Sequence, residues 1–134
     1  MDRPRMERQR VECDRPWDGV GYSRAIRVGN VIEVAGTSAT LRDGTVLHPN
    51  DVGQQTRVCL TTIVNAIEQL GGTAADVVRT RFFLTDISRW EESGAVHREF
   101  FGDVLPTSSM VEITRLLHPD LVVEIEATAI LDPS

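Results

Sequence analysis

The stretch GYSRAIRVGNVIEVAG, residues 21–36, decides how the fold begins. It contains two runs rich in β-branched residues, and Gly29 and Asn30 stand between them. A Gly-Asn pair supplies the positive φ angles that a tight turn between two strands requires. The stretch therefore predicts a β-hairpin over residues 24–36, and Asp43 followed by Gly44 predicts a second, smaller turn over residues 41–46.

Two helices are predicted downstream of this hairpin. Residues 51–70 repeat apolar side chains at steps of three and four, and the two glycines that follow end the helix. Ser88 is expected to begin the second helix, because Glu91 stands three residues later and completes a capping box. Gly102 is expected to end this helix.

Three further strands complete the predicted fold. Apolar and polar residues alternate in residues 77–85, 109–114 and 121–130, with the period of two that strands show. The order is then hairpin, helix, strand, helix, strand, strand. This order predicts a single α+β domain in which two helices pack on one face of a mixed sheet.

The chain has 134 residues and a mass of 14.9 kDa, which fits one domain with one core. Its arginine-rich start has no apolar run, so we expect a flexible N-terminal tail over residues 1–16 and a folded domain over residues 17–134. Two cysteines are too few for a disulfide framework, and no apolar run approaches the roughly 18 residues of a membrane helix. These features predict a cytoplasmic protein with no membrane partner.

The charges exclude several chemistries. A net charge of −6 and a pI near 5.0 argue against a nucleic-acid partner, which requires a basic surface. All 14 basic residues are arginine, so catalysis by a lysine Schiff base and a P-loop are excluded. The three histidines lack metal-ligand spacing, and we expect no metal and no cofactor. His97 and Cys59 fall on apolar helix faces, where they are expected to pack in the core.

One face of the predicted sheet combines charged and apolar residues. The alternation assigns nine residues to this face, namely Arg79, Arg81, Phe83, Met110, Glu112, Thr114, Glu124, Glu126 and Thr128. The complementary set is apolar and is expected under the helices; it contains Val111, Ile113, Val123, Ile125, Ala127 and Ala129. Phe83 and Met110 on a face without helices favour a subunit interface over a solvated surface.

Glu124 is the most unusual of these charged residues, because it lies in a strand of Val, Ile and Leu and needs a partner there. Two interpretations remain open. One is a cross-strand ion pair with Arg79 or Arg81. The other is a carboxylate that orients a water molecule or accepts a proton in an interface cleft.

Four segments of the chain resemble the RidA/YjgF family of reactive intermediate deaminases, which also carries the names endoribonuclease L-PSP and translation inhibitor. The segments are residues 21–36, DVVRTRFFLTDI at 76–87, PTSSMVEI at 106–113 and VEIEA at 123–127. They follow the family's order and spacing, and the similarity extends over roughly residues 17–131.

The resemblance implies a chorismate-mutase-like subunit and a homotrimer with three clefts between neighbouring subunits. Members of the best-known branch hydrolyse enamines and imines, such as 2-aminoacrylate, to 2-keto acids and ammonia. In their cleft an arginine holds the substrate carboxylate, a glutamate positions the attacking water and a tyrosine closes the site. A guanidinium suits the first task because it binds a carboxylate through two hydrogen bonds.

The motifs assign these roles to particular positions. Tyr22 corresponds to the tyrosine, Gly36 to the glycine that ends the second strand, and Glu124 to the catalytic glutamate. Ser108 stands where the family has its arginine, and Met110 stands where it has a cysteine. The chain thus resembles an arginine-less branch of the family.

Because the usual carboxylate clamp is missing, Arg81 or Arg79 is the candidate replacement, and Tyr22, Gly36, Arg81, Ser108 and Met110 form the expected ligand-binding set. Deaminase activity on 2-iminobutanoate and 2-iminopropanoate is predicted to be weak or absent.

Two functions remain open from the sequence. The chain is either a deaminase that hydrolyses enamine or imine intermediates through Glu124, or a non-catalytic trimer that binds a small metabolite. A ribonuclease or translation inhibitor follows only from the family's older names, and the acidic charge argues against it.

Overall fold

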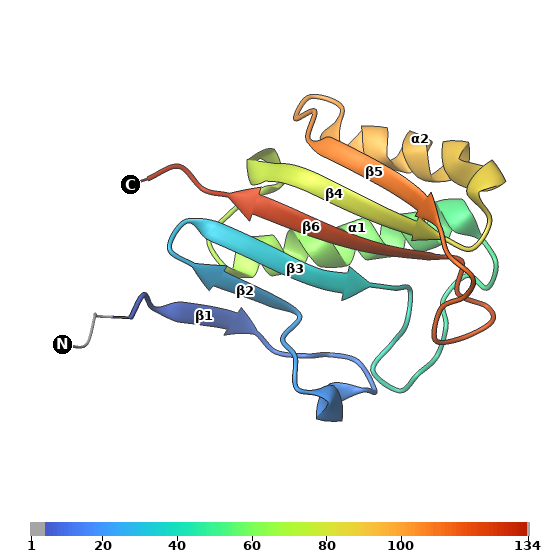
Figure 1. Cartoon of the computed structure of the whole chain (residues 1–134), viewed down its shortest axis with the longest axis horizontal. Coiled ribbons are helices and arrows are strands. Elements are labelled where there is room, and N and C mark those ends of the chain that lie inside the picture. The colour runs from blue at the N-terminus through green and yellow to red at the C-terminus, as the bar shows by residue number, and fades with distance from the viewer. Residues whose placement is uncertain (1–4, 134) are drawn as a thin grey trace.

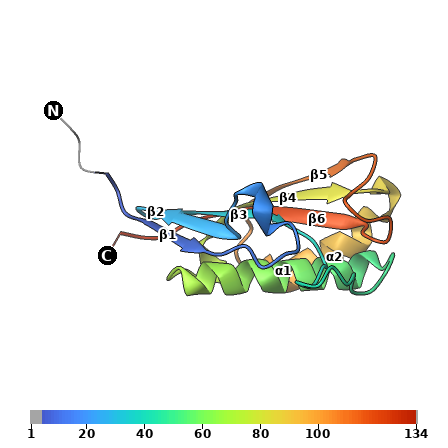
Figure 2. The same ribbon diagram turned by 90° about the horizontal axis from the view of Figure 1, so that it is seen from below.

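Six strands lie in the order β1-β2-β3-β6-β4-β5 in the computed structural model, which describes residues 5–133. The strands are β1 Arg8–Val11, β2 Ala25–Val28, β3 Val31–Thr37, β4 Val77–Leu84, β5 Thr107–Glu112 and β6 Val123–Ile130. Two helices, α1 Val52–Gln69 and α2 Trp90–Phe101, lie on the same side of this sheet (Figure 1, Figure 2). The predicted α+β class, with a mixed sheet and one layer of helices, is confirmed.

The predicted hairpin is formed by β2 and β3, with Gly29 in the turn at a φ of 60°. β3 also pairs with β6, and this ladder is irregular. Val34 is opposite Ala127 and Thr37 is opposite Ile125, so β3 carries one extra residue over this interval. Such a β-bulge bends the strand and redirects its side chains. We call residues 35 and 36 the β3 bulge.

The first helix agrees with its prediction, but the start of the second helix does not. The Asp51 side chain caps α1 by accepting from the Gln54 backbone N–H at 3.1 Å. The predicted capping box of Ser88 is wrong, because Asp86 accepts from the Ser88 N–H at 3.0 Å and a short 3₁₀ turn precedes α2. An aspartate that bonds to the backbone two residues ahead closes a local turn, which competes with a cap at Ser88.

The N-terminal segment is more ordered than expected. Residues 8–16 were assigned to the flexible tail, but Arg8–Val11 forms strand β1 and pairs antiparallel with β2. At the end of this strand the Val11 carbonyl oxygen accepts a hydrogen bond of 2.8 Å from the N–H of Arg24, the residue before β2. The reason is that the backbone groups of β2 need a partner on their free edge, and polar residues can supply one without an apolar pattern.

Strand β5 lies parallel to β4 at the edge of the sheet, and its side chains face the opposite way from the prediction. Ser108 is opposite Thr80 and Met110 is opposite Phe82, so both point toward the helices. Met110 accordingly packs against the core, whereas Val111 is on the open face and 46% exposed. Two adjacent apolar residues leave the alternation undecided, and the pairing with β4 sets the orientation instead.

The core lies between the helices and the sheet, and its polar members are hydrogen-bonded. Thr56 on α1 and Ser93 on α2 are fully buried and share a hydrogen bond of 2.8 Å. Cys59 on α1 is also fully buried, as predicted. No described helix has both the length and the apolar character to cross a membrane.

Candidate active site

Glu124 lies on the open face of the sheet, where β6 passes the β3 bulge. In the ladder between β6 and β4 it is opposite Phe83. Its carboxyl group lies directly against Gly36. A Cβ atom added to Gly36 would be 3.0 Å from both the Cδ and the Oε1 atom of Glu124. An added Cβ atom at this position would therefore force the Glu124 carboxyl group to move by a few tenths of an ångström.

The Glu124 carboxylate has no ion-pair partner among the described residues, so the predicted pair with Arg79 or Arg81 is wrong. Arg81 is instead 3.7 Å from Oε1 of Glu126, with both side chains 38% exposed. Burial raises the pKa of Glu124, and the negative charge of Glu126 raises it further, whereas the positive charge of Arg24 lowers it. The result is a half-buried carboxyl group that holds its proton more tightly than usual.

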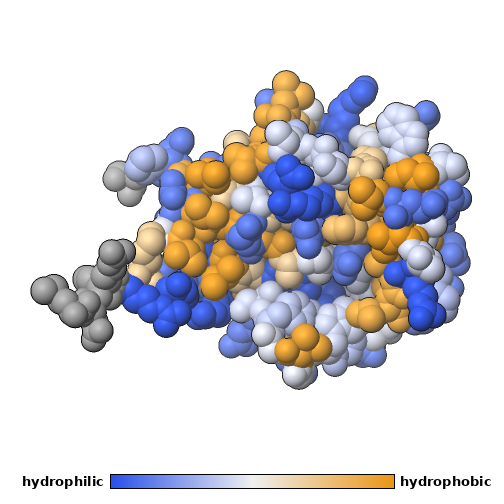
Figure 3. Space-filling view, in the orientation of Figure 1, coloured by the Kyte–Doolittle hydropathy of each residue, from blue (hydrophilic) through white to orange (hydrophobic). Residues whose placement is uncertain are grey.

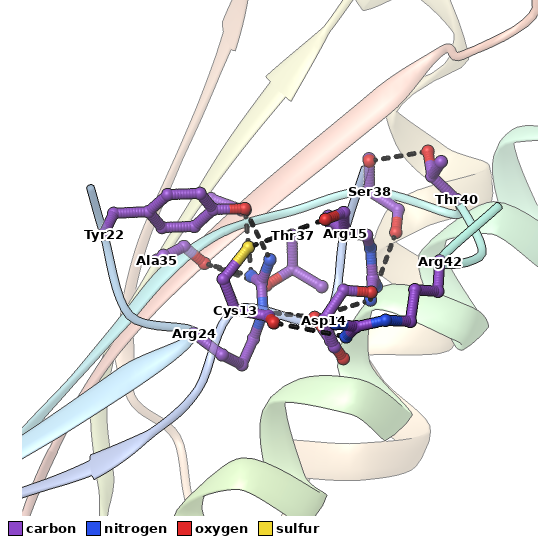
Figure 4. A network of polar contacts seen from close by, with 11 residues as sticks. Cys13, Asp14, Arg15, Tyr22, Arg24, Ala35, Thr37, Ser38, Thr40 and Arg42 are labelled. Carbon is purple, nitrogen blue, oxygen red and sulfur yellow. Dashed lines mark hydrogen bonds and ion pairs between the residues drawn. The ribbon is translucent and has the colours of Figure 1, made fainter. Parts of the chain in front are cut away.

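A buried arginine, Arg24, lies at the centre of a network of polar contacts that includes Ala35 and Thr37 of β3 (Figure 4). Arg24 is 1% exposed, and its guanidinium donates to the Gly36 carbonyl oxygen at 3.0 Å and to Thr37 Oγ1 at 2.8 Å. It also reaches the Ala35 carbonyl oxygen at 3.4 Å. On its other side, Arg24 Nε donates to Asp14 Oδ1 at 3.2 Å, which forms an ion pair. The β3 bulge is thus held by one side chain, that of the residue directly before β2.

The hydroxyl group of Tyr22 is hydrogen-bonded to the same guanidinium. Arg24 Nη2 donates to the Tyr22 hydroxyl at 3.4 Å, and the guanidinium carbon is 5.9 Å from the centre of the ring. Burial raises the pKa of Tyr22, and the neighbouring thiol of Cys13 raises it further. The phenol therefore stays protonated at neutral pH and can donate a hydrogen bond.

The N-terminal segment closes this network. Arg15 is buried, pairs with Asp14 at 2.8 Å and donates to the Ser38 carbonyl oxygen at 3.2 Å. The Ser38 and Thr40 hydroxyl groups then share a hydrogen bond of 3.0 Å. Asp14, Arg15 and Arg24 were missed by sequence reasoning. They are three polar residues on two segments and have no shared spacing, so only the turn between the segments brings them together.

An open groove of about 410 Å³ begins at Glu124. It is lined by Phe83, Ile113, Arg115, Leu116, Leu117, Glu124 and Glu126. Arg115 is exposed and is the one arginine among these residues. The space-filling view of this face shows hydrophilic surface over the middle of the sheet, with apolar areas toward both ends (Figure 3). The groove thus combines an apolar wall, a guanidinium and a carboxyl group whose pKa is raised.

The remaining predicted ligand-binding residues lie elsewhere in the subunit. Arg81 lines a neighbouring depression of about 360 Å³, which shares Glu126 with the groove. Ser108 and Met110 lie on the helix side of the sheet, away from Glu124. The Thr80 hydroxyl donates to Ser108 Oγ at 2.8 Å and lies 2.9 Å from Nε2 of His97. Burial lowers the pKa of His97, which packs between Phe82 and Phe101.

Two other groups of possible functional residues do not contribute here. Within residues 5–133, no three His, Cys, Asp or Glu side chains are placed to hold a metal ion. Burial strongly raises the pKa of the Cys59 thiol, so this residue remains a packing residue and not a nucleophile.

Comparisons with known proteins identify the family to which the chain belongs. The family model described as endoribonuclease L-PSP matches residues 14–131. The chain belongs to the YjgF family. The crystal structure of Rv2704 from Mycobacterium tuberculosis, a member of the YjgF/YER057c/UK114 family, is 46% identical. It superposes with a TM-score of 0.84 and covers 93% of this chain and 100% of its own.

Curated members of the YjgF family are also similar. A RutC family protein of Pyrococcus abyssi is 33% identical over 108 residues, which cover 81% of this chain and 84% of the relative. A protein of Acinetobacter baylyi named 3-aminoacrylate deaminase RutC is 30% identical over 108 residues, which cover 81% and 85%. The resemblance of the four sequence segments to the YjgF family is thereby confirmed.

Proposed function

We propose that the chain is a hydrolytic deaminase of small enamines or imines, and that Glu124 is its general base. The observation that carries this proposal is the contact of Glu124 with Gly36 at the mouth of an open groove. A carboxyl group without an ion-pair partner is free to bind water or substrate, and a raised pKa improves a carboxylate as a base. The relative named 3-aminoacrylate deaminase supports the same class of reaction.

The chemistry requires one proton acceptor that later becomes a donor. An enamine is in equilibrium with its imine through protonation at carbon. Water then adds to the carbon of the C=N bond, while the Glu124 carboxylate accepts one proton from that water. The carboxyl group passes that proton to nitrogen, which completes the carbinolamine. The carboxylate then accepts the proton of the carbinolamine hydroxyl and delivers it to nitrogen, so that the C–N bond breaks, the C=O bond forms and ammonia leaves. Enamine or imine plus water thus gives a carbonyl compound plus ammonia.

Arg115 is the residue of this groove that suits a substrate carboxylate. It lines the same groove as Glu124, whereas Arg81 is engaged with Glu126 in the neighbouring depression. A guanidinium forms two charge-assisted hydrogen bonds with a carboxylate. We therefore assign binding of the substrate carboxylate to Arg115 in place of Arg81. The protonated Tyr22 hydroxyl can donate a further hydrogen bond to the substrate.

The proposal includes a homotrimer in which other copies cover the open face. Three apolar side chains on this face are partly exposed in one subunit: Val31 at 37%, Ile130 at 45% and Val111 at 46%. They lie among charged residues, a combination that is typical of a subunit interface. In such a trimer Ser108, on the edge strand β5, would approach the groove of a neighbouring subunit.

A second candidate, a trimer that binds a metabolite without turnover, is favoured by Ser108. Its hydroxyl accepts a hydrogen bond from Thr80, and no guanidinium is present at this position. A serine hydroxyl gives less carboxylate binding than an arginine does.

The deciding experiment is a coupled assay in which a pyridoxal phosphate lyase generates 2-aminoacrylate in solution. Ammonia and keto acid are measured with wild-type protein, with Glu124→Gln and with Glu91→Gln on the exposed face of α2. We expect acceleration by the wild type, loss of that acceleration in Glu124→Gln and its retention in Glu91→Gln. Ligand binding by calorimetry without any acceleration would support the non-catalytic trimer instead.

A further inference from the structure

The burial of Arg24 has no explanation in the packing of the core. It heads the group of largest fully buried side chains, although the apolar core is formed by other residues of the sheet and helices. A buried guanidinium is costly unless every donor is satisfied. Arg24 meets this requirement with acceptors from three segments: the N-terminal segment, the loop before β2 and the β3 bulge.

The contacts of Arg24 converge on the one place where β3 departs from regular pairing. Two of its acceptors are carbonyl oxygens of the bulge, Ala35 at 3.4 Å and Gly36 at 3.0 Å, and a third is Thr37 Oγ1. Thr37 Oγ1 itself donates to the Ala35 carbonyl oxygen at 2.8 Å. The Ala35 N–H donates to the Arg24 backbone carbonyl oxygen at 2.9 Å, and the side-chain bonds of Arg24 add a second attachment through the carbonyl oxygens of the bulge, next to Gly36.

We propose that Arg24 is the positioning residue of this site: its guanidinium, anchored on Asp14, holds the β3 bulge so that Gly36 stays in contact with Glu124. The inference rests on the proposed function only in naming Glu124 as the base. Arg24 itself is buried and touches no substrate. Asp14 belongs to the N-terminal segment, so this segment is part of the active-site structure.

The electrostatics of Glu124 agree with this role. The charged or titratable groups around it are Glu126 on β6, Arg24 directly before β2, Cys59 on α1, Arg115 beyond β5 and Arg81 on β4. Among them, Arg24 lowers the pKa of Glu124, whereas burial and Glu126 raise it. Arg24 therefore helps to keep this carboxylate ionised in spite of its burial.

Carbon-detected NMR titration of the Glu124 carboxyl group tests the proposal, with the Gly36 amide resonance as a geometric readout. In Arg24→Met we expect the pKa of Glu124 to rise by about one unit, since a nearby opposite charge is lost. In Arg24→Lys the charge remains but the five acceptors are not all reached, so the Gly36 resonance should move while the pKa changes less.

Arg27→Met is the matched control. Arg27 is on β2, three residues after Arg24, and its guanidinium also bonds to backbone, namely the carbonyl oxygens of Gly29 and Leu70 at 2.8 Å. It lies at the far end of the hairpin, and both readouts should stay at wild-type values in this variant. If Arg24→Met does not fold, Asp14→Asn provides the test, because it removes the anchor and retains the guanidinium.

Unchanged readouts in a folded Arg24→Met or Asp14→Asn variant would overturn the proposal. Neither readout depends on turnover. Inactive wild-type protein with shifted resonances would therefore reject the proposed function and support the role of Arg24.

Discussion

Gln55 on α1 and Asp120 in the loop before β6 are joined by a hydrogen bond of 2.9 Å from the side-chain amide to the backbone carbonyl oxygen. The same amide nitrogen donates to the carbonyl oxygens of Leu47 and His48, and Oε1 accepts from the Val122 N–H at 3.0 Å. Gln55 is fully buried. One side chain of the helix layer thus fixes two loops, and the second of them leads from the groove to Glu124.

Gln55→Leu should destabilise the fold strongly. The substitution retains the volume but leaves several backbone groups without a partner, which costs about 3 kcal/mol of unfolding free energy. Urea unfolding at matched protein concentration measures the loss. Gln54→Leu, at the exposed neighbouring position, is the control and should stay close to wild type. An equal change in both variants would show that the buried bonds of Gln55 contribute nothing specific.

Glu124→Gln should be more stable than the wild type at pH 7. Burial and Glu126 raise the pKa of Glu124 in the folded protein above its ordinary value of 4.5. Below that value both states are protonated, and no stability difference arises. As the pH rises the unfolded state releases the proton first, so wild-type stability falls until the pH passes the folded pKa.

Thermal unfolding from pH 4 to pH 8 tests this linkage. The melting temperature of Glu124→Gln relative to wild type should rise with pH, whereas Glu91→Gln on the exposed face of α2 should show no such trend. A Glu124→Gln variant that is less stable than wild type at pH 7 would mean that this carboxylate has a stabilising partner.

Arg115→Met should weaken substrate binding in the coupled assay. Loss of one charge-assisted pair with a carboxylate costs on the order of 2 kcal/mol, or roughly a 30-fold decrease in kcat/KM. Arg89→Met is the control, because Arg89 forms a surface pair with Glu92 outside the groove. Equal activity of Arg115→Met and wild type would exclude Arg115 as the carboxylate-binding residue.

Ser108→Arg should increase the hydrolysis of 2-aminoacrylate. The resemblance to the family predicts an arginine at this position, where the chain has a serine, and we expect weak turnover for that reason. A restored guanidinium at a trimer cleft should recover part of the roughly 30- to 1000-fold deficit that a lost pair of about 2–4 kcal/mol implies. Wild-type turnover at the rate of an arginine-bearing relative, unaffected by Arg115→Met, would contradict this account.

The oligomeric state can be tested separately. Light scattering should give about three times the subunit mass of 14.9 kDa, and Val111→Asp should reduce that mass, because it places a charge at a trimer contact. Leu105→Asp is a control, since Leu105 is 80% exposed and precedes the edge strand. A monomeric wild type at micromolar concentration would remove the interface and its clefts from the proposal.

The sequence alone predicts the parts of this fold that have a strong local signal. Gly29 and Asn30 mark the hairpin, Asp51 and the apolar repeat mark α1, and family motifs point to Gly36 and Glu124. The orientation of β5 has no such signal, because Met110 and Val111 are both apolar and only the neighbouring strand decides between them.

The polar network around Arg24 shows a second structural feature that the sequence pattern does not predict. Asp14 and Arg24 are ten positions apart on segments joined by an irregular loop, and no periodicity relates them. A polar contact of this kind depends on the path of the loop. The strand that follows Arg24 could therefore be placed by pattern, whereas the ion-pair partner of Arg24 could not.

The central place of β6 has a consequence for biosynthesis. This strand is the last element of the chain, yet it pairs with β3 on one side and with β4 on the other, and Ile130 is opposite Val31. Until it leaves the ribosome, the hairpin half and the β4–α2–β5 half have no common strand. Pairing of the two halves therefore has to wait for β6 and is governed by contacts between distant parts of the chain, which slows folding. Gly36 and Glu124 meet only in that step, so the contact between them cannot form in a nascent chain before β6 has left the ribosome.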